Sequence, residues 1–321
     1  MKLRFYQSEI MNPYRNLAIE KYFVNHLKDD EYVIYFWVNK DTIVIGRNQY
    51  AYDQFDAEAV KQDGIKISRR LSGGGAVYHD INNLLFSFIM NAERFDKNSG
   101  YDILIKALRK IGIQAEKNGR NDVTVDGRKF SGNAFLNKGN IFCHHGTVLI
   151  NTDTQKMEKY LHVPKEKLNY KGVQSVKSRV VNLIEFDGEL NKETVMHAVW
   201  GAASDYFGET PDVVPEEYFD AKEIEESQKA FADKGFIFGE KLDGYELKSS
   251  RIDGFGLIDL YVKQKGGIVE AVKIFTDALS IPDTAHTEKL LSGKSFDAIA
   301  ELKNGENAFL DYAVNILTEG K

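Results

Sequence analysis

The chain has very little cysteine and no long apolar run. Cys143 is the single cysteine among 321 residues, which excludes an internal disulfide and any metal site built only from cysteine. No stretch approaches the roughly 18 consecutive apolar residues of a membrane span, and the opening MKLRFYQSEI lacks the apolar segment of a secretory signal. We therefore expect a cytoplasmic protein without a membrane partner.

Positive charge is also in short supply. Lysine and arginine number 42 against 48 aspartates and glutamates, and the formal net charge is -6 at pH 7. Dedicated nucleic-acid binders normally carry a basic excess, so we expect no nucleic-acid partner. Because 321 residues exceed what one hydrophobic core usually serves, we expect two domains.

Helical and strand patterns are mixed through the first 245 residues. Asn12 and Pro13 are a typical cap and first residue of a helix, and Ser99 is expected to cap another. Asp126-Gly127 predicts a hairpin turn, since both residues tolerate a positive φ. The expected helices are 13–28, 57–64, 99–112 and 192–208, the last with Val195, Val199, Ala202 and Tyr206 on one face; the expected strands are 32–38 and 42–46, on either side of a turn, then 65–70, 83–91 and 140–151.

The pattern changes near residue 245. GFGLIDLYVKQKGGIVEAVKIFTDAL predicts a strand, a Lys-Gly-Gly turn and a second strand, and short helices are expected between about 284 and 319. A sheet followed by helices is a plausible small domain. We therefore predict an α/β (α+β) protein whose domains span residues 1–245 and 246–321.

The segment RRLSGGGAVYHD, residues 69–80, places three consecutive glycines two residues after a pair of arginines. Arg69 and Arg70 carry planar cationic forks that suit phosphate or carboxylate, and the amides of Gly73 to Gly75 can approach an anion closely. A plain glycine-rich turn between two strands is the alternative explanation of the glycines. The chain has no GxxxxGK[ST] motif, so this is not a P-loop.

A second group of polar residues lies in GRNDVTVDGRKFSGNAF, residues 119–135. Lys129 is either a solvated strand lysine or a cation of the site. Asn121 and Asp122 are either turn residues, or Asp122 supplies a carboxylate oxygen to Mg²⁺ beside nucleotide phosphates.

Paired histidines stand in CHHGTVLIN, residues 143–151. Neighbours on a strand point to opposite faces, so one of His144 and His145 is expected to face a pocket and the other is not. The presence of one cysteine and the absence of HExxH spacing argue against a metal site here. Cys143 is either a small buried apolar residue or a thiol activated by an adjacent base.

These segments, together with VKSRVVNL at 176–183, occur in an order and at spacings that resemble the lipoate–protein ligases. The resemblance covers residues 1–245 as a catalytic domain and the remainder as the family's small accessory domain. It implies a mixed-sheet fold related to the catalytic domain of biotin protein ligases. It also implies an activity: lipoate attacks the α-phosphate of ATP, and a lysine of an apo lipoyl domain then attacks the lipoyl-adenylate.

The resemblance also implies roles for individual residues. Lys129 matches the lysine that contacts both the lipoyl carbonyl and the phosphate, and it is the expected catalytic residue. ATP would be held by Lys129, Arg70 and the backbone of Gly75, Ala76, Val77 and Tyr78; lipoate would be held by Lys129, Ser72, Gly73, Gly74 and His145; and Asp122 would hold Mg²⁺. The nearest apolar candidates for the lipoyl tail are Leu71, Val77 and Tyr78.

The resemblance further implies partners. Lipoic acid is the expected small-molecule substrate, and the expected acceptors are apo lipoyl domains of 2-oxoacid dehydrogenase complexes or the glycine-cleavage carrier protein. We expect the chain to act as a monomer. Two other functions stay open: an ATP-independent octanoyl or lipoyl transferase that uses Cys143, and a non-catalytic binder of lipoyl-adenylate or lipoyl domains.

Overall fold

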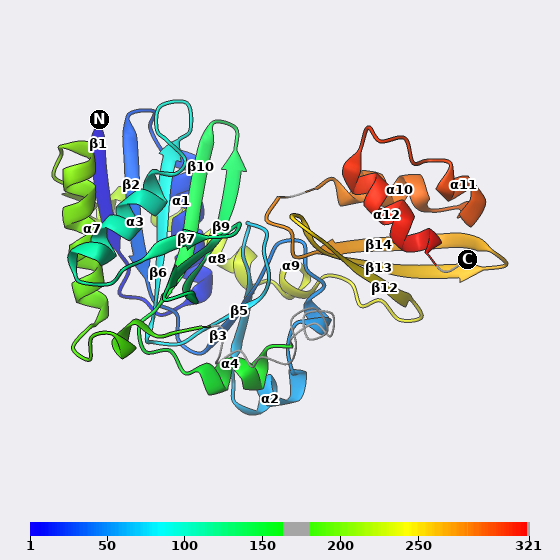
Figure 1. Cartoon of the computed structure of the whole chain (residues 1–321), viewed down its shortest axis with the longest axis horizontal. Helices are drawn as coiled ribbons and strands as arrows, with labels where there is room; N and C mark the ends of the chain where they lie inside the picture. Colours follow the sequence, from blue (N-terminus) through cyan, green and yellow to red (C-terminus); the bar gives the residue numbers. More distant parts are fainter. Residues whose placement is uncertain (163–179, 281, 320–321) are drawn as a thin grey trace.

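A mixed eight-stranded sheet forms the body of the larger part of the molecule (Figure 1). The computed structural model describes residues 1–162, 180–280 and 282–319. The strand order is β11-β1-β2-β6-β10-β9-β8-β7, with β1 parallel to both its neighbours and every other pair antiparallel. The strands are β1 Lys2–Gln7, β2 Glu31–Trp37, β6 Asn83–Asn91, β7 Glu116–Asn118, β8 Asp122–Val125, β9 Arg128–Lys138, β10 Ile141–Leu149 and β11 Asp212–Val213.

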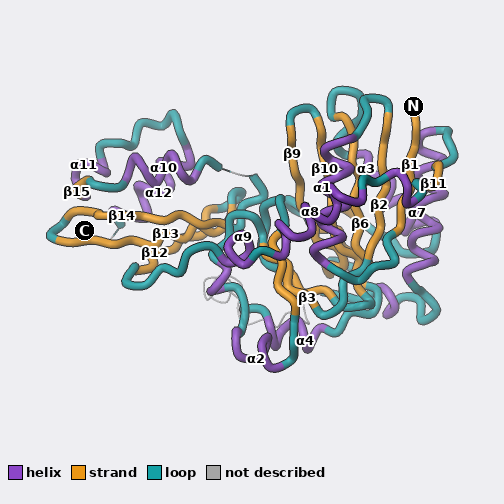
Figure 2. The backbone as a smooth tube through the Cα atoms, turned by 180° about the vertical axis from the view of Figure 1, so that it is seen from behind, coloured by secondary structure: helices purple, strands orange, loops and turns teal. Residues whose placement is uncertain are grey.

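Helices cover both faces of this sheet (Figures 1 and 2). They are α1 Pro13–His26 and α8 Ala221–Ala232 on one face, and α3 Ser99–Lys110 and α7 Lys192–Phe207 on the other. Alternate residues of β2 enter two different cores: Val33 and Tyr35 pack with α1 and α8, whereas Ile34 and Phe36 pack with α3 and α7. A strand buried on both faces must be apolar throughout, which explains the run YVIYFW.

A separate three-stranded sheet carries the glycine-rich segment. Its order is β4-β3-β5, with β3 Thr42–Ile45 between β4 Lys66–Arg69 and β5 Val77–His79. Residues 70–76 join β4 to β5, and residues 71–76 are here called the glycine loop. The expected strands 32–38 and 42–46 both form, but they belong to different sheets. The short β5 was not expected. Around this sheet lie α2 Ala57–Gln62, α4 Thr154–Tyr160, α9 Lys234–Phe238 and a single 3₁₀ turn at Ala51–Asp53.

The last part of the described chain has a sheet and a core of its own (Figure 1). The antiparallel strands are β12 Glu246–Ile252, β13 Gly256–Lys265, β14 Ile268–Thr276 and β15 Lys294–Ser295. The helices are α10 Thr284–Leu291, α11 Phe296–Ala300 and α12 Ala308–Thr318. The expected Lys-Gly-Gly turn joins β13 to β14, with positive φ at Gly266 and Gly267. We call residues 246–319 of this part the C-terminal unit.

The mixed sheet and the smaller second unit confirm the predicted fold class, and Asn12 caps α1 as expected. One local expectation was wrong. Ser99 does not cap α3, because its hydroxyl hydrogen-bonds with that of Tyr32 at 3.0 Å and Asn98 stands at the cap position. On α7, Val195, Val199 and Ala202 are buried, whereas Tyr206 is 39% exposed. Within the described ranges, no helix combines the length and apolarity needed to cross a membrane.

Candidate active site

A cavity of about 510 Å³ lies where the large sheet, the glycine loop and the C-terminal unit meet. Such a volume suits a small-molecule ligand. The large sheet and α1 contribute apolar side chains, including Leu17, Trp37 and Leu85. The polar lining residues are Asn39, Arg70, His79, Arg120, Asn121, Asp122, Lys129, Asn133, His145, Thr147, Arg251 and Asp277. Residues scattered from position 17 to position 279 therefore share one cavity.

The glycine loop is pressed against the C-terminal unit. Gly74 adopts φ of 89°, and its N–H donates to the carbonyl oxygen of Ala278 at 2.9 Å. A Cβ on Gly73 would lie 2.2 Å from that same oxygen. A Cβ on Gly75 would meet nothing within 4 Å, and Gly75 lines the cavity. Gly73 is thus required by its close contact with another part of the chain and Gly74 by its positive φ, and both hold before any ligand is considered.

The two arginines before the loop are buried and bonded to backbone oxygens. Arg69 donates to the carbonyls of Gly46 and Ile237, among others. Arg70 donates through Nη2 to the carbonyls of Gly73 at 2.7 Å and Gly75 at 2.8 Å. Burial lowers the pKa of each guanidinium to about 10, so both stay charged at neutral pH. Arg70 lines the cavity, but its donors bond to the loop and to the carbonyl of Val44 on β3.

Lys129 and Asp122 are brought together by the β8–β9 hairpin. Lys129 Nζ lies 2.7 Å from Asp122 Oδ1, and both side chains are about one-third exposed. A bulge after Val123 shifts the register of the two strands. A Cβ on Gly132 would lie 2.9 Å from Lys129 Nζ, so the glycine makes room for the ammonium group. Lys129 is therefore a partnered cation at the cavity wall and not a solvated strand lysine.

The paired histidines point to opposite faces of β10, as expected. His145 lines the cavity and His144 does not. His144 packs among aromatic rings, including Phe86 and Tyr101, and hydrogen-bonds to Asn133 Oδ1 at 2.8 Å. Burial lowers the pKa of His144 to about 3, so the ring is neutral at pH 7. His145 Nε2 lies 2.6 Å from Ser72 Oγ, which places both predicted lipoate ligands next to each other.

Cys143 is enclosed in the core under α1. Its side chain is fully buried and does not line the cavity. Burial raises the pKa of the thiol, and the nearby carboxylate of Glu20 raises it further. Glu20, Cys143 and His145 offer ligand atoms within 4.8 Å of one another. Hydrogen bonds already occupy Glu20 Oε1 and both ring nitrogens of His145, so this cluster is held together without an ion.

His79 lines the cavity. It belongs to the segment RRLSGGGAVYHD, but no role was predicted for it from the sequence. Burial lowers its pKa to about 3, and the charges of Arg70 and His145 act in the same direction. Asn39 Oδ1 accepts from Asn16 Nδ2 at 3.0 Å, so the Asn39 amide donates to His79 Nδ1 at 3.2 Å. The neutral ring therefore carries its proton on Nε2.

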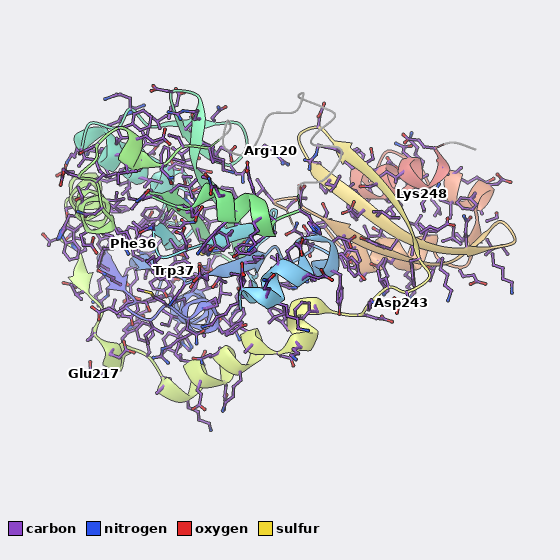
Figure 3. The ribbon with its side chains drawn as sticks, turned by 90° about the horizontal axis from the view of Figure 1, so that it is seen from below. Phe36, Trp37, Arg120, Glu217, Asp243 and Lys248 are labelled. Carbon is purple, nitrogen blue, oxygen red and sulfur yellow. The ribbon has the colours of Figure 1, made fainter. Side chains whose placement is uncertain are left out.

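Other lining residues have no local signature in the sequence. Arg120 precedes β8 and donates to the carbonyls of Gly254 and Phe255, and Figure 3 shows it at the junction of the two parts of the molecule. Arg251, on β12, pairs with Asp277 at 2.9 Å. Their presence at the cavity depends on how the C-terminal unit docks.

Some predicted residues lie elsewhere or outside the described ranges. Val77 and Ala76 line the cavity, whereas the side chain of Tyr78 is buried on the other face and donates to Asp41. Leu71 is not among the lining residues. Of VKSRVVNL, residues 176–179 lie outside the described part of the chain. The part of this motif that is described runs beside the site, since the N–H of Val181 donates to the carbonyl of Lys129 at 2.9 Å.

Known proteins match both parts of the chain. Residues 12–203 match the family model of the lipoyl protein ligase A/B catalytic domain, and residues 245–309 match that of the bacterial lipoate protein ligase C-terminus. The lipoate-protein ligase LplJ of Bacillus subtilis is 38% identical over 312 residues, covering 93% of this chain and 92% of its own.

Two solved structures share the fold. Plasmodium falciparum LipL1 in complex with lipoate aligns with a TM-score of 0.82 and 25% identity, over 99% of both chains. A bi-partite lipoate protein ligase from Thermoplasma acidophilum, studied with its E2 lipoyl domain, aligns with a TM-score of 0.64 and 25% identity. That alignment covers 74% of this chain and 97% of the other.

Proposed function

The chain belongs to the lipoate–protein ligase family, and from this membership we propose that it activates lipoate with ATP and transfers the lipoyl group to a lysine of an apo lipoyl domain. The observation that carries the proposal is the cavity in which Lys129, the glycine loop and His145 meet. The relative from P. falciparum, whose structure is that of a lipoate complex, supports lipoate as the substrate. The two proposed domains, 1–245 and 246–321, both contribute to the cavity wall.

The first step joins two anions. The lipoate carboxylate oxygen bonds to the α-phosphorus of ATP, and the bond from that phosphorus to pyrophosphate breaks. Fixed cations offset the repulsion, and Lys129, Arg120 and Arg251 line the cavity. Lys129 acts as a donor that stays charged, and losing one such contact typically costs ~3 kcal/mol of transition-state stabilisation. Its ion pair with Asp122 keeps the ammonium at the wall until substrate binds.

Mg²⁺ fits this site as a companion of the nucleotide. Magnesium bound with phosphates needs only one or two protein carboxylates, and Asp122 is a partly exposed carboxylate beside Lys129. In the described part of the chain, Asp122 belongs to no group of three potential metal ligands. When bound, the ion would neutralise phosphate charge, and Asp122 is the residue that would hold it.

The apolar wall suits the lipoyl tail. Leu17 and Trp37 line the same cavity as Lys129 and belong to the core between the large sheet and α1. We assign the dithiolane ring and its alkyl chain to this wall, with the carboxylate toward the glycine loop. Trp37 and Leu17 thereby take the place of Leu71 and Tyr78, which the sequence had suggested. Burial of an alkyl chain contributes ~0.8 kcal/mol per CH₂.

The second step transfers the acyl group. The lysine amine of the acceptor bonds to the lipoyl carbonyl carbon, the bond from that carbon to the phosphate oxygen breaks, and AMP leaves with the electron pair. The acceptor is either a lipoyl domain of a 2-oxoacid dehydrogenase or the glycine-cleavage carrier. The Thermoplasma relative, studied with its E2 lipoyl domain, supports the first. A transferase that uses Cys143 is disfavoured, because the thiol is buried away from the cavity with a raised pKa.

Intact-protein mass spectrometry of apo acceptors tests the proposal. An E2 lipoyl domain and the glycine-cleavage carrier are each incubated with the protein and lipoate, with and without ATP–Mg²⁺. We expect a lipoyl mass gain only with ATP, and a roughly hundredfold slower gain with Lys129→Ala. Lys138→Ala, an exposed lysine on the same strand, is the matched control. Gain without ATP, or no gain on either acceptor, would contradict the proposal.

A further inference from the structure

A buried chain of hydrogen bonds links helix α1 to the glycine loop. Glu20 Oε1, on α1, lies 2.8 Å from His145 Nδ1 on β10. His145 Nε2 lies 2.6 Å from Ser72 Oγ, which also accepts from Arg70 Nε at 3.0 Å. The residues are almost completely buried: Glu20 is 3% exposed and Ser72 is 0% exposed. A carboxylate on one helix is thus connected to the arginine that holds the loop.

The charge on Glu20 determines which atoms donate and which accept in this series of hydrogen bonds. Burial alone would raise the pKa of Glu20, but the charge of His145 and hydrogen bonds from His145, Ser87 and Cys143 outweigh it, and the pKa is lowered. An ionised carboxylate can only accept hydrogen bonds. His145 Nδ1 therefore carries a proton toward Glu20, and the ring is turned with Nε2 toward Ser72.

Arg70, at the other end, sets the peptide planes of the loop. Its Nη2 holds the carbonyls of Gly73 and Gly75. In a trans peptide the N–H points opposite to the carbonyl, and the described chain has no cis peptides. The N–H of Gly74 therefore points away from the guanidinium, toward Ala278, and the N–H of Ala76 is also turned away. The shape of the cavity wall at the loop depends on where the guanidinium is fixed.

We propose that Glu20 is a positioning residue, which acts through His145 and Ser72 to fix Arg70 and with it the peptide planes of the glycine loop. Glu20 does not line the cavity. The inference rests on the proposed function for its kinetic readout, since the loop is where lipoate and ATP would bind. Its structural readout depends on the loop alone.

Steady-state kinetics of Glu20→Gln provides the first test. Glutamine keeps the size and one accepting oxygen and removes the charge. The matched control is Glu31→Gln, since Glu31 is also a fully buried carboxylate, on β2, paired with Arg4 and remote from the cavity lining. In lipoate-dependent ATP–pyrophosphate exchange we expect KM for lipoate and ATP to rise at least tenfold for Glu20→Gln and less than twofold for the control. A merely destabilised enzyme has fewer active molecules and an unchanged KM, so an unchanged KM overturns the inference.

Hydrogen–deuterium exchange provides a readout that needs no activity. Peptides that cover residues 70–79 are compared in the wild type, Glu20→Gln and Glu31→Gln without substrates. We expect amides of the loop to exchange at least tenfold faster in Glu20→Gln only. If the wild type lacks ligase activity but Glu20→Gln still exchanges faster, the proposed function is contradicted and the positioning role stands. If the wild type is active and Glu20→Gln exchanges at the wild-type rate, the positioning role alone is contradicted.

Ser72→Ala extends the exchange measurement if Glu20→Gln does not fold. It removes the Ser72 hydroxyl and with it the hydrogen bonds that connect His145 to Arg70. We expect the same faster exchange of the loop. Wild-type protection of residues 70–79 in this variant overturns the inference.

Discussion

Replacing Gly73 by alanine tests how the glycine loop and the C-terminal unit are fitted together. The added Cβ would lie 2.2 Å from the carbonyl oxygen of Ala278 and 2.8 Å from that of Leu279. Real Cβ contacts essentially never fall below 3.0 Å, so the turn at 278–279 must retreat by at least 0.8 Å. Both atoms belong to the backbone, which cannot turn aside as a flexible side chain can.

The retreat also weakens the bond from the N–H of Gly74 to Ala278, now 2.9 Å. A lost hydrogen bond costs roughly 0.5–1.5 kcal/mol, and overpacking of a fitted contact costs roughly 1–3 kcal/mol. We expect Gly73→Ala to lower the free energy of unfolding by about 1.5–4.5 kcal/mol, the sum of these two ranges.

Urea denaturation at pH 7, followed by tryptophan fluorescence, measures this change. Gly75→Ala is the matched control, because its Cβ meets nothing within 4 Å and its φ is not positive. An alanine there is expected to be neutral or to stabilise by about 0.4–1 kcal/mol through the unfolded chain. Equal stability of Gly73→Ala and Gly75→Ala would refute the reasoning, since the contacts with the carbonyls of Ala278 and Leu279 exist at Gly73 and not at Gly75.

Two further outcomes follow from burial. Cys143→Ala should keep lipoyl transfer within a few-fold of the wild type, because the thiol is buried away from the cavity; complete loss of transfer in a folded variant contradicts this. Burial lowers the pKa of His79 and of His144 to about 3. Below pH 6.5 the unfolded chain therefore binds more protons than the folded chain does. The free energy of unfolding must fall as the pH drops from about 6.5 toward 3. At pH 5 the loss is up to about 2 kcal/mol per histidine, and His144→Gln should show a shallower decline in urea titrations at pH 7 and pH 5.

The sequence predicted the features that depend on close neighbours. Asn12 caps α1 through bonds from the next residues, and the Asp126-Gly127 turn has the positive φ values that its two residues tolerate. The opposite orientation of His144 and His145 follows from the period of a strand alone. The order of the motifs was enough to indicate the family, and the matches to both family models confirm it.

What the sequence missed are pairings between elements that are distant along the chain. The local rules let Ser99 cap α3, but its hydroxyl bonds to Tyr32 across the core instead. Arg251 was not considered, because nothing beside it in the sequence indicates a cavity. Glu20 was read only as part of a helix, although it accepts from His145, 125 residues away.

By itself, the sequence determined most of the helices and strands and indicated the family, because capping, turn conformation and apolar periodicity act over a few residues. Only the tertiary structure decided which residues share the cavity, since that depends on sheet register and on docking. The three glycines illustrate both. Their position shortly after Arg70 is evident from the sequence. Gly73 and Gly74, however, contact Ala278, which lies more than two hundred residues later, and a Cβ on Gly75 would meet open space.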